Sequence, residues 1–599
     1  MADDHSERER TRRKIHPGVF ESQEQLWQGR ISRREFLRVA TLLGAGAATA
    51  AFLAACGEEE GMGGTEPPPA PTAPTTPPAP VAPTTPPAPV APTTAATAVP
   101  AVAAIKRGGT LRCGMQIMGV DHPARFSWTE PSNVFRQVFE YLTETDENNI
   151  THPLLLESWE PNDDLTVWTL QLRPGIKWTN GEELVADHVA FNFNEWLNPD
   201  VGSSILGLWE GYLTPDGIEV VDDYTLRLNL AQPKLDVPEN LFHYPALIVH
   251  PSFDGDIASG QNPSTGPYLL DEYIVGERAR LVRRTDYWQV GEDGQPLPYL
   301  DAIEYIGLGD DQTAYVSAIQ NGDIHAIYEP TIDTFQALKG NPDVVIYPRD
   351  TAQVRVLRMR VDQEPWTDNR VRLALKKCQD RQKILDLAFL GEGQLGHDFH
   401  VAPVMPEFVP MDVPMYDPEG ARQLLTEAGY GDGLNAAISV GTGWSDIVAY
   451  AETLQADAQP AGFNLTLDTM PNQNYWDLWT EVSLGITAWT HRPLAVMVLP
   501  LAYTADSEGN PVPWNETRWV DEEFDRLLKQ AVATIDIEAR KAIMADIERI
   551  QLERGPIGIA FWKRVWETFN PAFQGVKAHP TLYHLWREVW YDPARDPHA

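Results

Sequence analysis

Apolar residues alternate with polar ones in several short segments of this 599-residue chain. In Val167–Leu172 and again in 224–230 every second residue is apolar, which is the period of a strand with one buried face. Segment 110–116 is a third predicted strand. Because a one-sided strand must bury its apolar face against other elements, the pattern predicts sheets within a larger body.

Other segments carry apolar residues at the spacing of an amphipathic helix. Between 368 and 387 the apolar positions recur at near-helical spacing, and Asp368 stands where an N-cap accepts amide hydrogen bonds. A long segment, 521–554, mixes acids and bases on an amphipathic pattern and is predicted to be helical with a break near Asp536. Strands interleaved with helices predict an α/β body.

The N-terminus has a different pattern. Residues 39–53 form an uncharged run of 15 residues, which is short for a membrane-spanning helix and suits the core of a signal peptide. Arg33 and Arg34, followed by Phe-Leu and a basic residue, resemble a twin-arginine export signal. The run ends in Leu-Ala-Ala-Cys, which resembles a bacterial lipobox in which Cys56 takes a lipid and becomes the mature N-terminus. The alternative is an uncleaved anchor that ends near an unrelated cysteine.

Residues 1–55 are therefore predicted to be a lipoprotein signal peptide, and 56–105 a disordered stalk. Between 65 and 100, 14 of 36 residues are proline, and the unit Pro-Thr-Thr-Pro-Pro-Ala-Pro-Val-Ala occurs twice. Such a chain lacks the amide donors of helix and sheet and favours polyproline II. At roughly 3.1 Å per residue the stalk would reach on the order of 110 Å.

Charge and cysteine content limit the partners. The chain has 47 Lys+Arg against 85 Asp+Glu, a formal charge of −38. Such a surface repels phosphate backbones and anionic lipid, so we expect no nucleic-acid partner and attachment to the membrane through the lipid on Cys56. In the body, Cys113 and Cys378 lie far apart inside apolar segments, and we expect two buried free thiols in preference to a disulfide.

Short motifs occur in a fixed order through the body. They lie at 154–160, 163–170, 172–181, 186–191, 265–269, 286–288, 297–301, 318–324 and 366–375. Together they resemble the family 5 solute-binding proteins of ABC importers, a group that includes oligopeptide, dipeptide, nickel and some oligosaccharide receptors. The resemblance covers nearly all of 106–599.

The resemblance implies an α/β, two-lobe periplasmic-binding-protein fold of type II, in its large variant with an extra subdomain. Its ligand lies in a cleft between the lobes, and closure presents a new surface to the membrane permease. We place the first lobe at 106–150, 263–352 and 556–599, the extra subdomain at 151–262 and the second lobe at 353–555. We expect a monomer that has no cofactor and is not an enzyme. A surface receptor or sensor lipoprotein, or a metal-dependent hydrolase, are the alternative classes.

The sequence leaves the identity of the ligand undecided. In peptide-binding members an acidic residue that follows an aromatic-containing strand meets the peptide's amino terminus; here 484–489 resembles that strand, but Thr-His-Arg-Pro follows it. Arg492 suits a carboxylate, phosphate or sugar hydroxyl, or else pairs with a structural acid. Peptide binding persists if the acid comes from elsewhere, for example Asp446. Oligopeptide or dipeptide is the default ligand, and an oligosaccharide or another polar solute that stacks on aromatic rings is the alternative.

Further candidate contacts are aromatic or cationic. Arg125 and Trp128 follow the first strand, in a segment that lines the cleft mouth in the family. Arg355 and Arg358 share a strand at the start of the second lobe, where each meets an acid or a ligand carboxylate. The remaining candidates are Trp444, Trp489, His491 and Trp514. No metal site is predicted, and His397 and His400 are only weak metal candidates, because histidine pairs of this spacing are usually loop residues.

Overall fold

The structure is a computed structural model that describes residues 105–309, 311–506 and 508–598. The predicted signal peptide and stalk, with Arg33, Arg34 and Cys56, lie outside the described residues. The chain divides into two units, 1–100 and 101–599, and the described residues all belong to the second unit. No helix in the described part is long and apolar enough to cross a membrane.

Eleven strands of the described residues form one mixed sheet. Its spatial order is β15 (Phe463–Met470), β14 (Leu434–Gly441), β16 (Leu484–Trp489), β12 (Val345–Met359), β17 (Ile557–Phe569), β11 (Ala326–Ile327), β1 (Thr110–Gly114), β10 (Ala302–Ile306), β9 (Arg278–Arg283) and β8 (Tyr268–Ile274), with β13 (Gly393–Leu395) pairing β17. Strand β1 runs parallel to β10 and β11, as β14 does to β15 and β16. The predicted strand at 110–116 is confirmed as β1.

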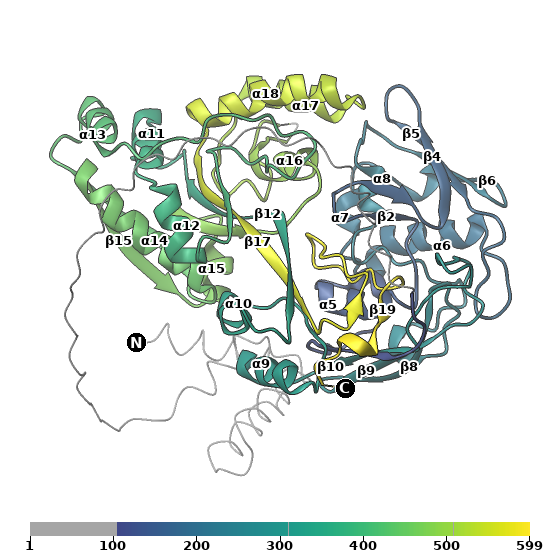
Figure 1. Ribbon diagram of the computed structural model, residues 1–599. Helices are drawn as coiled ribbons and strands as arrows, with labels where there is room; N and C mark the ends of the chain where they lie inside the picture. The colour runs from purple at the N-terminus through teal and green to yellow at the C-terminus, as the bar shows by residue number, and fades with distance from the viewer. Residues whose placement is uncertain (1–104, 310, 507, 599) are drawn as a thin grey trace, which may run out of the picture. The chain divides into compact units, whose positions relative to one another are not determined.

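Strands β12 and β17 join the two halves of this sheet and run antiparallel, side by side (Figure 1). Val345 to Asp350 pair in register with Phe569 to Arg564, and the register then shifts on either side of Val354. Beyond the shift β12 also pairs with β16, from Val354 to Met359. This irregularity lies where the chain passes from one half of the sheet to the other, as a bulge re-aims a strand. The lobe boundaries themselves stay a prediction.

A separate antiparallel sheet has the order β4 (Leu156–Pro161), β5 (Val167–Leu172), β7 (Thr225–Asn229) and β6 (Ile218–Asp222). The alternating segments predicted as strands are thus confirmed as β5 and β7. Helix α6 (Ala186–Leu197) packs on β6 and β7. A hairpin of β2 (Thr143–Thr145) and β3 (Thr151–Pro153) precedes this sheet in the chain.

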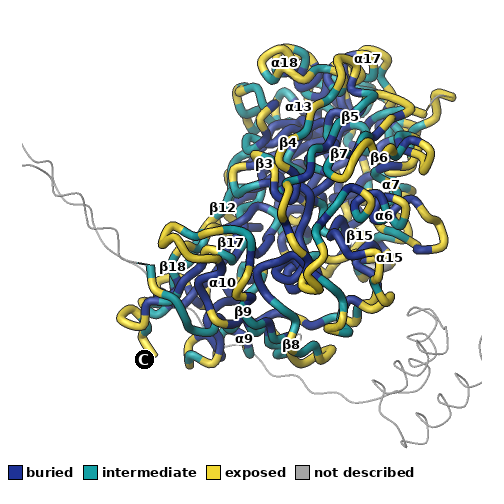
Figure 2. Tube along the Cα trace, turned by 90° about the vertical axis from the view of Figure 1, so that its right-hand side faces the viewer, coloured by how far each residue is buried: buried dark blue, intermediate teal, exposed yellow. Residues whose placement is uncertain are grey.

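The helical segments fold with clear breaks. Segment 368–387 is two helices, α11 (Asn369–Lys377) and α12 (Arg381–Phe389), where the pattern predicted one; Asp380 caps the second, accepting from Lys383 N–H. Asp368 caps α11 as predicted. The predicted break near Asp536 is confirmed, because α17 (Glu522–Val532) ends before it and α18 (Ile537–Arg554) begins after it. Both helices carry exposed residues on one side and buried ones on the other (Figure 2).

The remaining helices of the described residues are α5 (Thr129–Phe135), α7 (Leu206–Trp209), α8 (Val237–Asn240), α9 (Gln312–Asn321), α10 (Ile332–Leu338), α13 (Pro418–Glu427), α14 (Ser445–Ala458), α15 (Asn472–Leu478) and α16 (Leu499–Tyr503). Two short strands, β18 (Phe573–Gln574) and β19 (Trp590–Tyr591), pair near the C-terminus. The two cysteines of the described residues, Cys113 and Cys378, are buried and unpaired, as predicted.

Candidate ligand-binding site

The two predicted lobes contact each other through Asn149 and His491. Asn149 lies in the turn between β2 and β3 with a positive φ of 63°. Its amide nitrogen donates to the Val404 carbonyl at 3.0 Å, and its oxygen lies 2.9 Å from His491 Nε2. Because His491 Nδ1 accepts from Ala352 N–H at 2.9 Å, the neutral ring carries its proton on Nε2 and donates to Asn149. Burial lowers the pKa of His491 to about 3. This candidate contact thus connects the lobes.

The next residue, Arg492, has a different environment. Within the described ranges its guanidinium has no hydrogen-bond or ion-pair partner. Burial lowers its pKa, against the opposing effects of Tyr244 and Tyr583. Burial and then the charge of Arg492 lower the pKa of His243 to about 3, and that of His400 likewise. Arg492, from the second predicted lobe, therefore faces side chains of the rest of the molecule as an unpaired cation.

Five tryptophans form a chain of edge-to-face contacts in the second predicted lobe. Ring centroids lie 6.0 Å apart from Trp489 to Trp514, 6.2 Å from Trp514 to Trp479, 5.6 Å from Trp479 to Trp476, and 6.1 Å from Trp476 to Trp444. Trp489 is buried, whereas Trp514 is 49% exposed. Three of the five were predicted as contacts. The buried end of the chain, Trp489, lies three residues before Arg492 in the sequence, and its neighbour Trp514 offers a half-exposed ring.

Arg355 and Asp446 form a buried ion pair. Arg355 Nε lies 2.8 Å from Asp446 Oδ2, and its guanidinium stands 5.4 Å from the Trp444 ring centre. Lys563 Nζ lies 3.6 Å from the same carboxylate oxygen. Burial alone favours the neutral carboxyl, but Arg355 and then Lys563 hold the pKa of Asp446 below its ordinary value. These two candidates therefore satisfy each other, and Asp446 is not free to receive a ligand amine.

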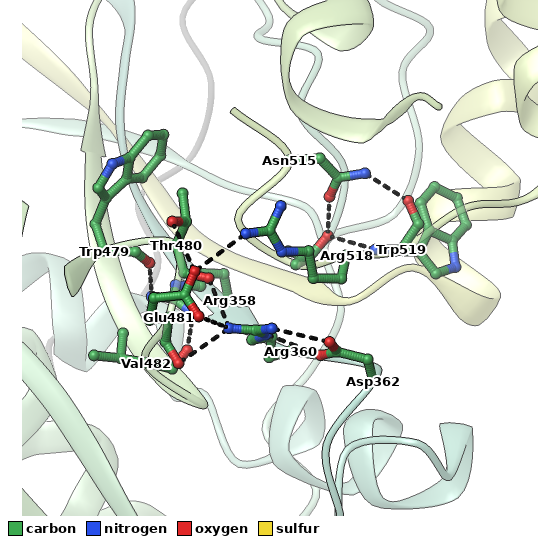
Figure 3. A network of polar contacts seen from close by, with 11 residues as sticks. Arg358, Arg360, Asp362, Trp479, Thr480, Glu481, Val482, Asn515, Arg518 and Trp519 are labelled. Carbon is green, nitrogen blue, oxygen red and sulfur yellow. Dashed lines mark hydrogen bonds and ion pairs between the residues drawn. The ribbon is translucent and has the colours of Figure 1, made fainter. Parts of the chain in front are cut away.

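Arg358 is fully buried and structurally engaged (Figure 3). Its terminal nitrogens donate to the carbonyls of Trp479 and Val482, and its Nε lies 3.4 Å from Glu516 Oε2. Glu516 also accepts from Trp489 Nε1–H at 3.0 Å. The guanidinium thus ties β12 to the segments before and after β16.

Exposed pairs continue this network at the surface (Figure 3). Arg360 Nε lies 2.9 Å from Asp362 Oδ1, and its Nη1 lies 2.8 Å from Glu481 Oε2. Arg518 reaches Glu481 at 3.4 Å. Such exposed pairs contribute little to stability.

Arg125 and Trp128 both precede α5, Arg125 at the end of a short 3-10 helix and Trp128 at the N-cap of α5. Arg125 is exposed, and its Nη1 lies 2.6 Å from Asp121 Oδ2 while its Nε donates to the Val201 carbonyl at 2.5 Å. Trp128 is 61% exposed. The arginine therefore has local partners, and the tryptophan presents an open ring.

Two carboxylates near the joining strands were not predicted. Glu130 lies in α5, and Glu329 follows β11 with a positive φ of 45°. Neither has an ion-pair partner among the residues that the structure describes. Crowding by surrounding protein atoms raises the pKa of both, and the charge of Glu130 adds to the effect on Glu329. No sequence signal marked them, because single acids in this acidic chain carry no pattern.

His397 and His400 have separate partners. His397 Nε2 lies 2.9 Å from the Met411 carbonyl, and His400 Nδ1 lies 2.8 Å from the Tyr503 hydroxyl. Each ring is buried against aromatic neighbours, His397 against Phe399 and His400 against Trp489. Each histidine ring is thus hydrogen-bonded to its own partner within the fold.

A closer group of potential metal ligands is Glu182, His188 and His250, whose ligand atoms lie within 4.8 Å of one another. However, His188 Nδ1 accepts from Trp178 Nε1–H and His250 Nδ1 accepts from Ser252 N–H, both at 3.1 Å. Neutral rings bonded in this way carry their proton on Nε2, where it blocks a metal. His250 Nε2 lies 2.8 Å from Glu182, which accepts that proton. This group is a hydrogen-bonded cluster.

Two lobes joined by paired strands, with unpaired charged side chains where they meet, are the architecture of a two-lobe binding protein. The chain belongs to the bacterial extracellular solute-binding proteins, family 5, whose middle region matches residues 151–510. Members of this family bind small solutes and work with ABC permeases.

The chain is similar to several named proteins. The dipeptide-binding protein DppE of Bacillus subtilis is 23% identical over 491 residues, 76% of this chain and 86% of that protein. The glutathione-binding protein GsiB of Salmonella paratyphi A is 27% identical over 347 residues, 57% of this chain and 65% of that protein. The structure of HbpA2 from Haemophilus parasuis covers 81% of this chain at 22% identity, with a TM-score of 0.71, and so shows the fold alone.

Proposed function

We propose that this protein is the lipid-anchored binding component of an ABC importer and that its default cargo is an oligopeptide or dipeptide. The solute stabilises the closed arrangement by touching both lobes, and the closed form docks on the permease. The protein acts as a monomer tethered through Cys56 and has no chemistry of its own. The relatives DppE and GsiB are named as binding proteins, which supports this role.

One observation carries the proposal: both predicted lobes bring unpaired charges to the region where they meet. The second lobe brings Arg492, and the first brings Glu130 and Glu329. Arg492 and Glu130 are partly buried, and a charge shielded from water costs free energy unless a partner compensates it, whereas Glu329 is exposed and accessible to a ligand. A peptide carries both an amine and a carboxylate, so it complements the two signs at once. The named cargoes of DppE and GsiB are of this kind.

A saccharide is the second candidate, and the chain of tryptophans favours it. Sugar rings stack on aromatic faces, and the half-exposed ring of Trp514 lies within a row of five, between Trp489 and Trp479. An aromatic side chain of a peptide would use the same rings. The tryptophans therefore support a ligand with a ring and do not by themselves separate the two classes.

The closure is tested by measuring one distance between spin labels. Val290 and Met415, 61% and 83% exposed, accept cysteines on the two predicted lobes, while Cys113 and Cys378 are buried and stay unlabelled. Cys56→Ser removes the remaining thiol. Di- to pentapeptides and cello-, xylo- and manno-oligosaccharides are added in turn to the full chain.

A bound solute should raise the unfolding midpoint, since 100 times the dissociation constant adds about 2.7 kcal/mol of stability. The same solute should shorten and narrow the 290–415 distance. A solute that raises the midpoint but leaves the distance unchanged would refute closure.

A further inference from the structure

Arg492 differs from the other shielded arginines in the described part of the chain. Each of those has a partner: Arg355 pairs with Asp446, Arg381 with Asp398 at 2.6 Å, and Arg587 with Glu144. Arg372, which lacks a carboxylate, donates to the carbonyls of Trp366 and Arg554. Arg492 is the one partly buried or buried arginine of the described residues that has no acceptor.

The surroundings of Arg492 do not supply the missing negative charge. The acid that acts on it, Asp236, is engaged by Lys234 at 3.0 Å. The other neighbours, Tyr244, Tyr583 and His243, are neutral, and the buried Nδ1 of His243 has no partner in the described structure. A guanidinium among neutral polar groups is arranged to receive an acceptor from outside the chain.

Position adds a second argument. Residue 492 follows His491, which contacts Asn149 of the first predicted lobe, so the guanidinium stands beside a contact that forms between the lobes. A ligand group bound there touches both lobes at once. A solute held by Arg492 is therefore placed to contact both lobes when they meet.

We propose that Arg492 anchors a carboxylate of the imported solute, so that the protein takes carboxylate-bearing solutes and rejects their neutral analogues. The inference rests on the proposed binding function and names the substrate class. A planar guanidinium fork matches a carboxylate with two parallel hydrogen bonds. One unaccompanied cation balances the single charge of a carboxylate; the double charge of a phosphate would be left half compensated.

Pairs of probes that differ only in having a carboxylate or its neutral derivative test the contribution of the carboxylate charge to binding. Trialanine is compared with trialanine amide, and trigalacturonic acid with its methyl ester, by calorimetry on the full-length protein. We expect the acid of at least one pair to bind about 10- to 100-fold more tightly than its neutral partner, the strength of a charge-assisted bond. Arg492→Gln should abolish the difference, Arg492→Lys should keep part of it, and Arg526→Gln, at an exposed arginine of α17, should keep all of it.

A second measurement needs no ligand. Removing an uncompensated cation relieves its cost, so Arg492→Met should raise the unfolding midpoint by about 1–3 °C. Arg355→Met, which leaves the buried Asp446 with only the more distant Lys563, should lower it. Equal affinity for acid and neutral probes, or a preference that survives Arg492→Gln, would overturn the inference while leaving the binding function intact. A lower midpoint for Arg492→Met would show a structural role and overturn it even if no probe binds. An unchanged label distance with every bound probe would instead refute the proposed function.

Discussion

Arg355 and Arg492 are both shielded cations, and they differ in whether a carboxylate accompanies them. The sequence predicted both as possible ligand contacts, because it shows that an arginine occupies a strand or loop but not which acid faces it. The acid that satisfies Arg355 lies 91 positions away in the chain, at the start of α14. The candidate site was therefore predictable as residue types and not as pairs.

The Arg355–Asp446 pair gives the first prediction. Asp446→Asn leaves a buried guanidinium and the nearby Lys563 without their carboxylate, so it should destabilise the protein by about 3–5 kcal/mol. Chemical denaturation with a fluorescence readout measures this. Asp432→Asn, at an exposed acid, is the control and should change little. A loss as small as that of the control would mean that the pair is not buried in solution.

Two buried glutamates give a prediction for pH. Burial raises the pKa of Glu548 and of Glu567 from an ordinary 4.5 to about 8. The folded state keeps these protons after the unfolded chain has released them. Their contribution is therefore complete below pH 4.5 and is lost as pH rises towards 8.

Relative to Glu548→Gln and to Glu567→Gln, the parent should lose stability as the pH rises from about 5 to about 8. The buried histidines His243, His400 and His491, whose pKa is lowered, act in the opposite direction but do so alike in the parent and the variants. Each carboxyl accounts for on the order of a few kcal/mol across this window. Unfolding midpoints measured at both pH values check this. Parallel profiles for the variants and the parent would contradict it.

At the scale of elements, the sequence predicted those strands and helix starts that a local pattern of residues determines. The period-two segments became β5 and β7, and Asp368 and Asp536 cap helices where the pattern placed helix starts. The break between α11 and α12 was missed, because apolar residues keep near-helical spacing across it while Asp380 caps a new helix. The pairing of β12 with β17 joins positions about two hundred residues apart, and no local pattern encodes it.

The joining strands give a prediction of their own. At the register shift the buried Thr351 hydroxyl donates to the Lys563 carbonyl at 2.7 Å and accepts from Gln353 N–H at 3.0 Å. Thr351→Val keeps the shape and removes both bonds, which should cost about 1–2 kcal/mol and broaden the 290–415 label distance without ligand. Thr351→Ser keeps the hydroxyl and should behave as the parent. An unbroadened distance in Thr351→Val would show that the crossing is held by the strands alone.

At the scale of the whole molecule, the joining strands and the lobe contact are connected by hydrogen bonds. Ala352, at the register shift, donates to His491, and His491 donates to Asn149, whose amide reaches Val404. Any change of angle between the lobes at β12 must therefore make or break the hydrogen bonds of the Asn149 side chain. His491 was predicted as a ligand contact, but both of its ring nitrogens are already hydrogen-bonded, to Ala352 and to Asn149.

The substitution Asn149→Gly removes the side-chain amide that bridges the lobes and keeps the turn that carries it. Glycine adopts the positive φ of 63° without strain, so the turn between β2 and β3 persists while the bridging amide is lost. Losing these hydrogen bonds at about 1 kcal/mol each shifts the lobe equilibrium about fivefold or more towards separation. The unliganded label distance should lengthen, and solute should dissociate faster. Asn148→Gly, at the exposed neighbouring position, should leave both unchanged. If Asn149→Gly also left both unchanged, His491 and Asn149 would touch without controlling the lobes, and closure would depend on the solute and Arg492 alone.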